Sequence, residues 1–165
     1  MGAGKSTVGR HLARGLHKTF VDGDKVIEER TGASISLIFE IEGESGFRQR
    51  EAAVIDELTR RQEVVLATGG GAILREDNRR CLADRGYVIY LRAPLELLVE
   101  RTTRDRKRPL LANSDPRRRL MDLMAEREPL YREVAHLIID TGHRTVSQVI
   151  SVIRQQCRQP DPSGR

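Results

Sequence analysis

Met1-Gly2-Ala3-Gly4-Lys5-Ser6-Thr7 opens the chain, and this stretch decides the fold. Its end, Gly4-Lys5-Ser6, completes the pattern G-x-x-x-x-G-K-[ST] of a phosphate-binding loop. Small residues let backbone N–H groups face phosphate oxygens, and the helix that begins near Lys5 adds the positive end of its dipole. Lys5 can reach the β- and γ-phosphates, and the Ser6 hydroxyl can bind Mg²⁺. The stretch predicts that the chain binds a nucleoside triphosphate, although a chance turn with a helix N-cap would also fit so short a run.

The loop pattern is incomplete at its start, because its first glycine would lie two positions before Met1. A loop of this kind also follows a buried strand. We therefore expect a strand and a first loop glycine upstream of Met1. Without that strand, its two neighbours would keep unpaired backbone groups, and the core would contain an open groove.

Composition narrows the class of protein. The 165 residues suit one domain, and with 4% aromatic residues and no Trp the core must be filled by aliphatic side chains. The net charge of +5 fits either a nucleic-acid-binding protein or an enzyme for small anionic molecules, although solvated arginine-rich faces would also account for part of it. Because the basic residues are spread along the chain and aromatic residues are few, we expect no nucleic-acid partner.

The cysteine spacing and the lack of long apolar segments indicate a cytoplasmic protein. Cys81 and Cys157 are far apart and lack metal-ligand spacing, which suits a reducing compartment. No apolar run approaches the ~20 residues that span a bilayer, so we expect no membrane association. No signal peptide is visible. We further expect a monomer with a frayed tail over residues 159–165.

Helical patterns alternate with short apolar runs along the chain. The runs predict strands at residues 19–21, 64–67, 87–91 and 137–139. Helices are predicted after Lys5 and at 25–30, 35–41, 46–61, 75–84, 94–101, 116–133 and 146–157. This alternation favours an α/β fold with a parallel sheet covered by helices on both faces.

Two clusters follow predicted strands, where ligands gather in such sheets. In Asp22-Gly23-Asp24, one carboxylate can help to hold Mg²⁺ through water and the other can accept a proton from a substrate hydroxyl. Asx hydrogen bonds with a helix N-cap at Asp24 would also explain the pair. The run Gly69-Gly70-Gly71 makes sense where a ligand approaches the main chain closely.

Three further segments carry arginines. Arg48 and Glu51 are three residues apart and so share a helix face. They could form a solvated ion pair, or Arg48 could bind a substrate carboxylate as a fork that Glu51 holds in place. The basic run 104–111 is either a solvated loop or a lid that closes on the triphosphate. Arg127 lies just before Pro129, a residue that usually breaks a helix.

Taken in order, these segments resemble the shikimate kinase family over essentially the whole chain. The resemblance implies a three-layer P-loop kinase fold with a five-stranded parallel sheet, its first strand absent from this chain. It also implies a single domain over residues 1–158, a substrate-binding region at about 23–61 and a mobile lid at about 102–115. The segments that carry it are Gly2 to Thr7, Asp22 to Asp24, Gly43 to Arg48 with Glu51, Thr68 to Gly71, Arg108 to Leu111 and Arg127 to Tyr131.

The same resemblance implies a reaction and residue roles. The reaction is ATP-dependent phosphorylation of the 3-hydroxyl of shikimate, on the chorismate pathway to aromatic amino acids, with Mg²⁺. The expected catalytic residues are Lys5, Asp24 and Arg108, and those holding shikimate are Asp24, Arg48, Gly70 and Arg127. Ser6 would bind the metal directly, and Asp22 would lie in the second coordination sphere of the metal. The nucleotide would be bound by Gly2, Ala3, Gly4, Lys5, Ser6, Thr7, Arg108 and Arg144.

Two alternatives stay open at this stage. A kinase for another polyol acid, such as gluconate, would share the loop and lid but should lack the Phe47-Arg48 and triple-glycine signals. The other is a non-catalytic basic domain that binds nucleotide or nucleic acid as a regulator, and intact Lys5, Asp24 and Arg108 argue against it.

Overall fold

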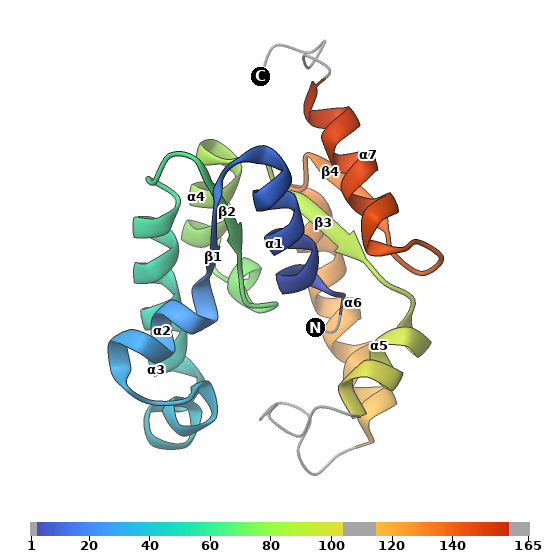
Figure 1. Cartoon of the computed structure of the whole chain (residues 1–165). Helices are drawn as coiled ribbons and strands as arrows, with labels where there is room; N and C mark the ends of the chain where they lie inside the picture. Colours follow the sequence, from blue (N-terminus) through green and yellow to red (C-terminus); the bar gives the residue numbers. More distant parts are fainter. Residues whose placement is uncertain (1–2, 104–114, 159–165) are drawn as a thin grey trace.

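The alternation of helices and strands predicted from the sequence is present in the structure. The computed structural model describes residues 3–103 and 115–158 (Figure 1). The strands are β1 (Thr19–Asp22), β2 (Val64–Ala67), β3 (Ile89–Arg92) and β4 (Leu137–Asp140). The helices are α1 (Lys5–Leu16), α2 (Gly23–Thr31), α3 (Ile35–Leu58), the short 3-10 turn η1 (Ala72–Leu74), α4 (Glu76–Arg85), α5 (Leu95–Thr103), α6 (Pro116–Val134) and α7 (Val146–Arg158).

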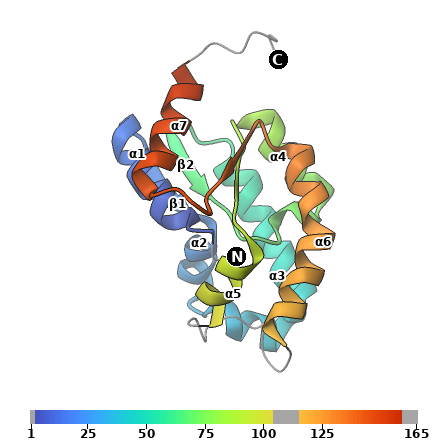
Figure 2. The same cartoon turned by 90° about the vertical axis from the view of Figure 1, so that its right-hand side faces the viewer.

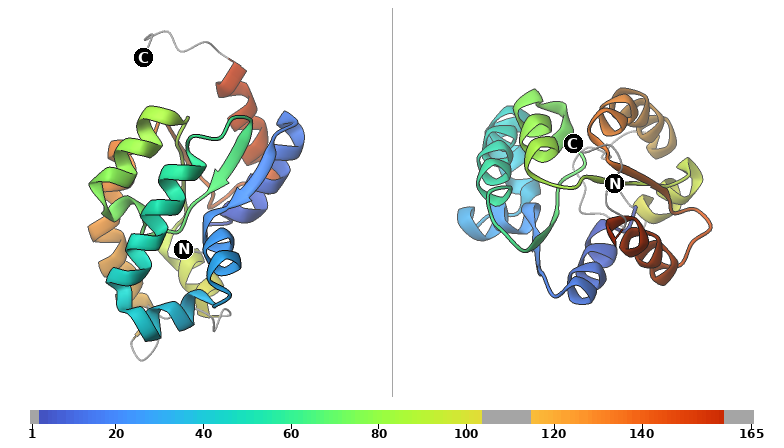
Figure 3. Two further views of the ribbon diagram at one scale, coloured as in Figure 1. Left: turned by 90° about the vertical axis from the view of Figure 1, so that its left-hand side faces the viewer. Right: turned by 90° about the horizontal axis from the view of Figure 1, so that it is seen from above.

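The strands form a middle layer between two layers of helices. Helices α1 and α7 lie on one face of the strands, and α3, α4 and α6 lie on the other (Figures 2 and 3). Helix α2 packs against α3, and α5 packs against α6. This arrangement follows from short apolar strands that need cover on both faces.

The middle layer is split into two parallel pairs of strands. Strand β1 pairs with β2 from Thr19↔Val64 to Asp22↔Ala67, and β3 pairs with β4 from Ile89↔Leu137 to Arg92↔Asp140. Among the described residues, nothing pairs with the second edge of β2 or of β3. A cavity of about 1470 Å³ lined by residues 64–67 of β2 and 89–91 of β3 lies between the pairs. The open groove expected from the sequence is therefore present.

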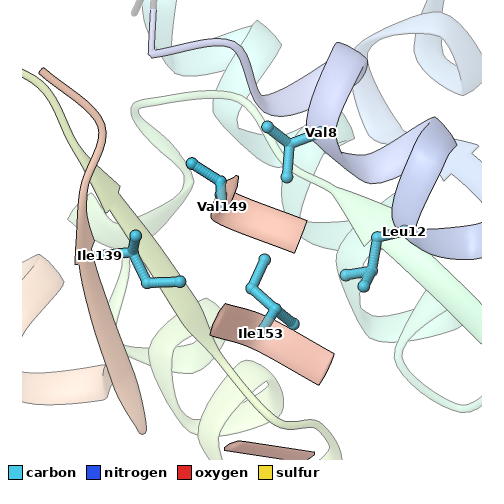
Figure 4. Packing of buried hydrophobic residues seen from close by; sticks show 5 residues of the cluster. All are labelled: Val8, Leu12, Ile139, Val149 and Ile153. Atoms are coloured by element: carbon cyan, nitrogen blue, oxygen red, sulfur yellow. The ribbon is translucent and has the colours of Figure 1, made fainter. Parts of the chain in front are cut away.

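Aliphatic side chains hold the helices onto the strands, as the scarcity of aromatic residues required. Val8 and Leu12 of α1 meet Val149 and Ile153 of α7 and Ile139 of β4, and all five are at most 5% exposed (Figure 4). Each such side chain contributes about 1.5–3 kcal/mol relative to an exposed position. This cluster fixes α1, and with it the end of the phosphate-binding loop.

Three local features bear on details of the sequence predictions. Two helices were predicted on either side of residues 42–45, and α3 does consist of two helical segments across a kink, with the break confined to Gly43, whose φ of 69° and ψ of −179° are not helical. Pro129 lies inside α6, which runs to Val134, so the helix predicted over residues 116–133 is confirmed although proline usually breaks a helix. The N-cap of α2 is Asp22, so the alternative interpretation that placed the cap at Asp24 is wrong.

Candidate active site

The phosphate-binding loop ends at a helix N-terminus next to β1. Gly4 adopts a left-handed conformation with φ of 83° and caps α1, a conformation that favours glycine. The Ser6 hydroxyl then donates a hydrogen bond to Asp22 Oδ2 over 2.8 Å. This hydrogen bond thus joins the loop to the carboxyl end of β1, through the two side chains that were predicted to hold Mg²⁺.

Asp24 lies in the first turn of α2, two residues after β1 ends. Burial raises the pKa of its carboxyl group, and the neighbouring Asp22 carboxylate raises this pKa further. The positive charges of Lys5 and Arg48 act in the opposite direction. Asp24 therefore lies within electrostatic reach of both the lysine of the phosphate-binding loop and the arginine of α3.

Arg48 and Glu51 form a buried ion pair, so the interpretation of this spacing as a solvated pair is wrong. Arg48 Nη1 lies 2.7 Å from Glu51 Oε2, and the side chains are 11% and 3% exposed. Arg48 also contacts Glu44 at 2.9 Å. Burial opposes the guanidinium charge, but pairing with Glu51 and Glu44 together outweighs it and raises the pKa of Arg48. Burial of Glu51 beside Asp24 raises the pKa of the Glu51 carboxyl group despite this pairing.

The glycine run after β2 is packed against these charged side chains. A Cβ atom at Gly69 would lie 2.6 Å from Glu51 Oε1 and 2.9 Å from Asp24 Oδ1. A Cβ atom at Gly71 would lie 2.2 Å from Arg48 Nη2. A side chain at either position would have to displace these charged groups, so the glycines allow the protein's own charged groups to lie against the main chain.

Arg127 of α6 completes the cluster. Its side chain is buried, with 5% of the residue exposed. Within the described part of the chain, Arg127 Nε and Glu51 Oε1 have no hydrogen-bond partner. Arg127 is close enough to Glu51 and Tyr131 to lower the pKa of both groups, against the stronger effect of burial. Buried polar atoms without partners are rare and indicate a place where another molecule can bind.

The remaining site predictions fall elsewhere. Ala3 lines the cavity between β2 and β3, and Thr7 is exposed. Arg144 follows β4, donates to the Asp140 carbonyl over 3.0 Å and lines a separate hollow of about 540 Å³. Gly2, Arg108, most of the predicted lid and the predicted tail lie outside the described residues.

Sequence reasoning missed one side chain at this site. Tyr131 donates a hydrogen bond to the carbonyl oxygen of Gly70. The available signal was its spacing, because Tyr131 follows Arg127 by four residues and so shares its helix face. Its partner on the glycine run could not be read from that spacing.

A family model described as shikimate kinase matches residues 1–158. The chain belongs to the shikimate kinase family. It is thus an enzyme, a phosphotransferase. The shikimate kinase of Bordetella pertussis is 57% identical over 150 residues, which cover 91% of this chain and 71% of that protein. The shikimate kinase of Nitrosococcus oceani is 55% identical over 159 residues, covering 96% of this chain and 84% of that protein.

A solved structure of the family has the same fold. Shikimate kinase from Acinetobacter baumannii in complex with shikimate superposes with a TM-score of 0.92 at 53% identity, covering 95% of this chain and 88% of that one. The mixed α/β architecture with parallel strands is thereby confirmed. None of the helices described for this shikimate kinase family member is long and apolar enough to cross a bilayer.

Proposed function

We propose that this chain transfers the γ-phosphoryl group of ATP to the 3-hydroxyl of shikimate. The observation that carries the proposal is the convergence of Lys5, Asp24, Arg48 and Arg127 around the glycine run. The Acinetobacter baumannii relative, 53% identical to this chain, was solved in complex with shikimate.

Arg48 and Arg127 would bind the shikimate carboxylate. Both guanidinium groups are largely buried, so a carboxylate between them would form charge-assisted hydrogen bonds with little competition from water. Arg127 Nε has no partner among the described residues and can donate to such a ligand. Glu51 holds Arg48 at 2.7 Å and so limits the positions that the guanidinium can adopt.

Asp24 would orient the 3-hydroxyl and accept its proton. Its raised pKa makes the carboxylate a better base than an ordinary exposed Asp. Lys5, whose charge acts on Asp24, would bind the β- and γ-phosphates from the other side. A main-chain contact from Gly70 would hold the shikimate ring between Asp24 and Lys5.

ATP and Mg²⁺ are the cofactors that we propose. The Ser6 hydroxyl and the Asp22 carboxylate are oxygen donors of the kind that Mg²⁺ prefers, and they lie 2.8 Å apart. When bound, the ion would neutralise charge on the β- and γ-phosphates. Roles for Gly2 and Arg108 at the phosphates and for Arg144 beside the adenine rest on the family pattern.

The complete sheet, we propose, has five parallel strands in the order β1-β2-X-β3-β4. The unpaired edges of β2 and β3 and the cavity between them support an extended segment at position X. Ala3 lines the same cavity, which puts the start of the phosphate-binding loop at the edge of this position. We also propose one domain over residues 1–158, with the substrate-binding region at about 23–61 and the lid at about 102–115, acting as a cytoplasmic monomer without a nucleic-acid partner.

A coupled ADP-release assay with shikimate, quinate and gluconate tests the reaction. It should be run on the chain and on a version translated from about a dozen residues upstream of Met1, long enough for a strand at ~3.3 Å per residue. ADP release with shikimate alone is the expected result. Release with gluconate alone would favour the kinase of another polyol acid. If both versions bind ATP but neither releases ADP with any of the three acids, a regulatory domain would be favoured.

A further inference from the structure

Tyr131 connects the helix that bears Arg127 to the glycine run. Its hydroxyl donates to the Gly70 carbonyl oxygen over 2.5 Å, although 61 residues separate the two in sequence. Its ring stacks on Tyr90 of β3, with centroids 4.7 Å apart and ring planes at 19°. The ring and the hydroxyl thus have different partners, and the two contacts can be separated by substitution.

The segment after the glycine run has anchors of its own. Asn78 Nδ2 donates to the Ala72 carbonyl over 2.9 Å, and Arg79 Nη1 donates to the Ile73 carbonyl over 2.9 Å. Both anchors come from α4, on the other side of η1. Tyr131 instead holds the run at Gly70 itself, from α6.

We propose that Tyr131 is a positioning residue, whose hydroxyl fixes the orientation of the Gly70–Gly71 peptide relative to Arg127. A trans peptide directs its C=O and N–H in opposite directions. Binding the Gly70 carbonyl to Tyr131 therefore directs the Gly71 N–H to the opposite side of the peptide. The inference rests on the proposed function, in which substrate lies between this run and Arg127.

The hydroxyl is suited to act as a constant donor. Burial raises the pKa of Tyr131, and the Arg127 guanidinium lowers it by less. The group therefore keeps its proton throughout the neutral range, so the hydrogen bond to Gly70 does not depend on pH there. Loss of the hydroxyl would leave the Gly70 carbonyl free to rotate and would also remove a neighbour of Arg127.

The test compares Tyr131→Phe with Tyr90→Phe. Each variant removes one hydroxyl and keeps the stacked rings, but the Tyr90 hydroxyl binds Glu128 and not the glycine run. The expected result for Tyr131→Phe is an increase in the shikimate KM of about 5-fold, as for one lost hydrogen bond. The ATP KM and kcat should stay close to the parental values, the Tm should fall no further than in Tyr90→Phe, and Tyr90→Phe should leave the shikimate KM unchanged.

A merely structural role predicts a different outcome. Equal KM increases in both variants, or a fall in Tm with parallel increases in both KM values, would overturn the proposal, as would an unchanged shikimate KM in Tyr131→Phe. Hydrogen exchange of the Gly71 and Ala72 amides in the ligand-free protein is a second readout. It should accelerate in Tyr131→Phe alone, and equal rates in the two variants would also overturn the proposal. Because exchange needs no turnover, it decides the matter even if the parent does not phosphorylate shikimate.

Discussion

Arg48 and Arg127 come from different helices and both act on the Glu51 carboxyl group, so each guanidinium is positioned independently. We expect Arg48→Ala and Arg127→Ala each to raise the shikimate KM sharply, because a desolvated charge contact contributes ~2–5 kcal/mol. Arg50→Ala is the matched control, since its pair with Glu42 is on the same helix but its side chain is 45% exposed. Steady-state kinetics measure all three. An unchanged KM in both of the first variants would show that the carboxylate binds elsewhere.

Asp24 is the side chain on which the chemical step depends. Asp24→Asn keeps the size of the group but removes its ability to accept the hydroxyl proton. We expect kcat to fall by about 10²–10⁴-fold with the circular dichroism spectrum unchanged. Near-parental turnover in this variant would assign the base to another group.

Glu51 should make the stability of the protein depend on pH. Its pKa in the folded state is raised by burial above the ordinary value of 4.5. As pH rises through this window, the unfolded chain loses the proton first, so the contribution of Glu51 to the free energy of unfolding falls. The parent should therefore lose stability relative to Glu51→Gln between about pH 4 and the folded-state pKa of Glu51. Urea unfolding at several pH values measures this difference, and an opposite slope would mean that pairing with Arg48 outweighs burial.

Helix α3 is interrupted at one residue, and the interruption directs Arg48. Gly43 has φ of 69° and ψ of −179°, a region open almost solely to glycine, so Gly43→Ala should cost about 1–3 kcal/mol of stability. It should also raise the shikimate KM, because Glu44 and Arg48 directly follow the break. Ser45→Ala is the control on the exposed surface of the same helix. Equal denaturation midpoints for the two variants would contradict this account.

Elements were predictable from the sequence where a local pattern decides them. Strand β2 was predicted with its observed bounds, Val64–Ala67, because a short apolar run ends in glycines there. The helix predicted over residues 116–133 is α6, and it continues through Pro129 although proline usually breaks a helix. The glycine run was predicted to be a place where another group approaches the main chain closely. The sequence could not show that the side chains of Glu51, Asp24 and Arg48 are the groups that lie against Gly69 and Gly71. Such contacts join segments that are distant in sequence, as does the hydrogen bond from Tyr131 to Gly70. The spacing of residues along the sequence therefore cannot predict them.

At the scale of the whole molecule, two half-sheets share one set of covering helices. Helix α1 packs on β1 and β2 and also on α7, which covers β4 through Ile139. The halves are therefore held together by helices, while the cavity of about 1470 Å³ separates their facing edges. Both halves contribute to the site, since Asp24 follows β1 and Arg127 precedes β4. Any change in the separation of the halves would move these two side chains relative to each other.

A strand at position X should therefore strengthen both the fold and nucleotide binding. We expect the version translated from upstream of Met1 to bind ATP more tightly and to unfold at higher urea than the chain that starts at Met1. The reason is that each Val or Ile buried in the cavity contributes about 1.5–3 kcal/mol and that both open edges gain backbone hydrogen bonds. The control carries two prolines in the added segment, which remove donors from the ladder and keep the length. If the three proteins share one ATP affinity and one urea midpoint, the cavity between β2 and β3 does not hold a strand.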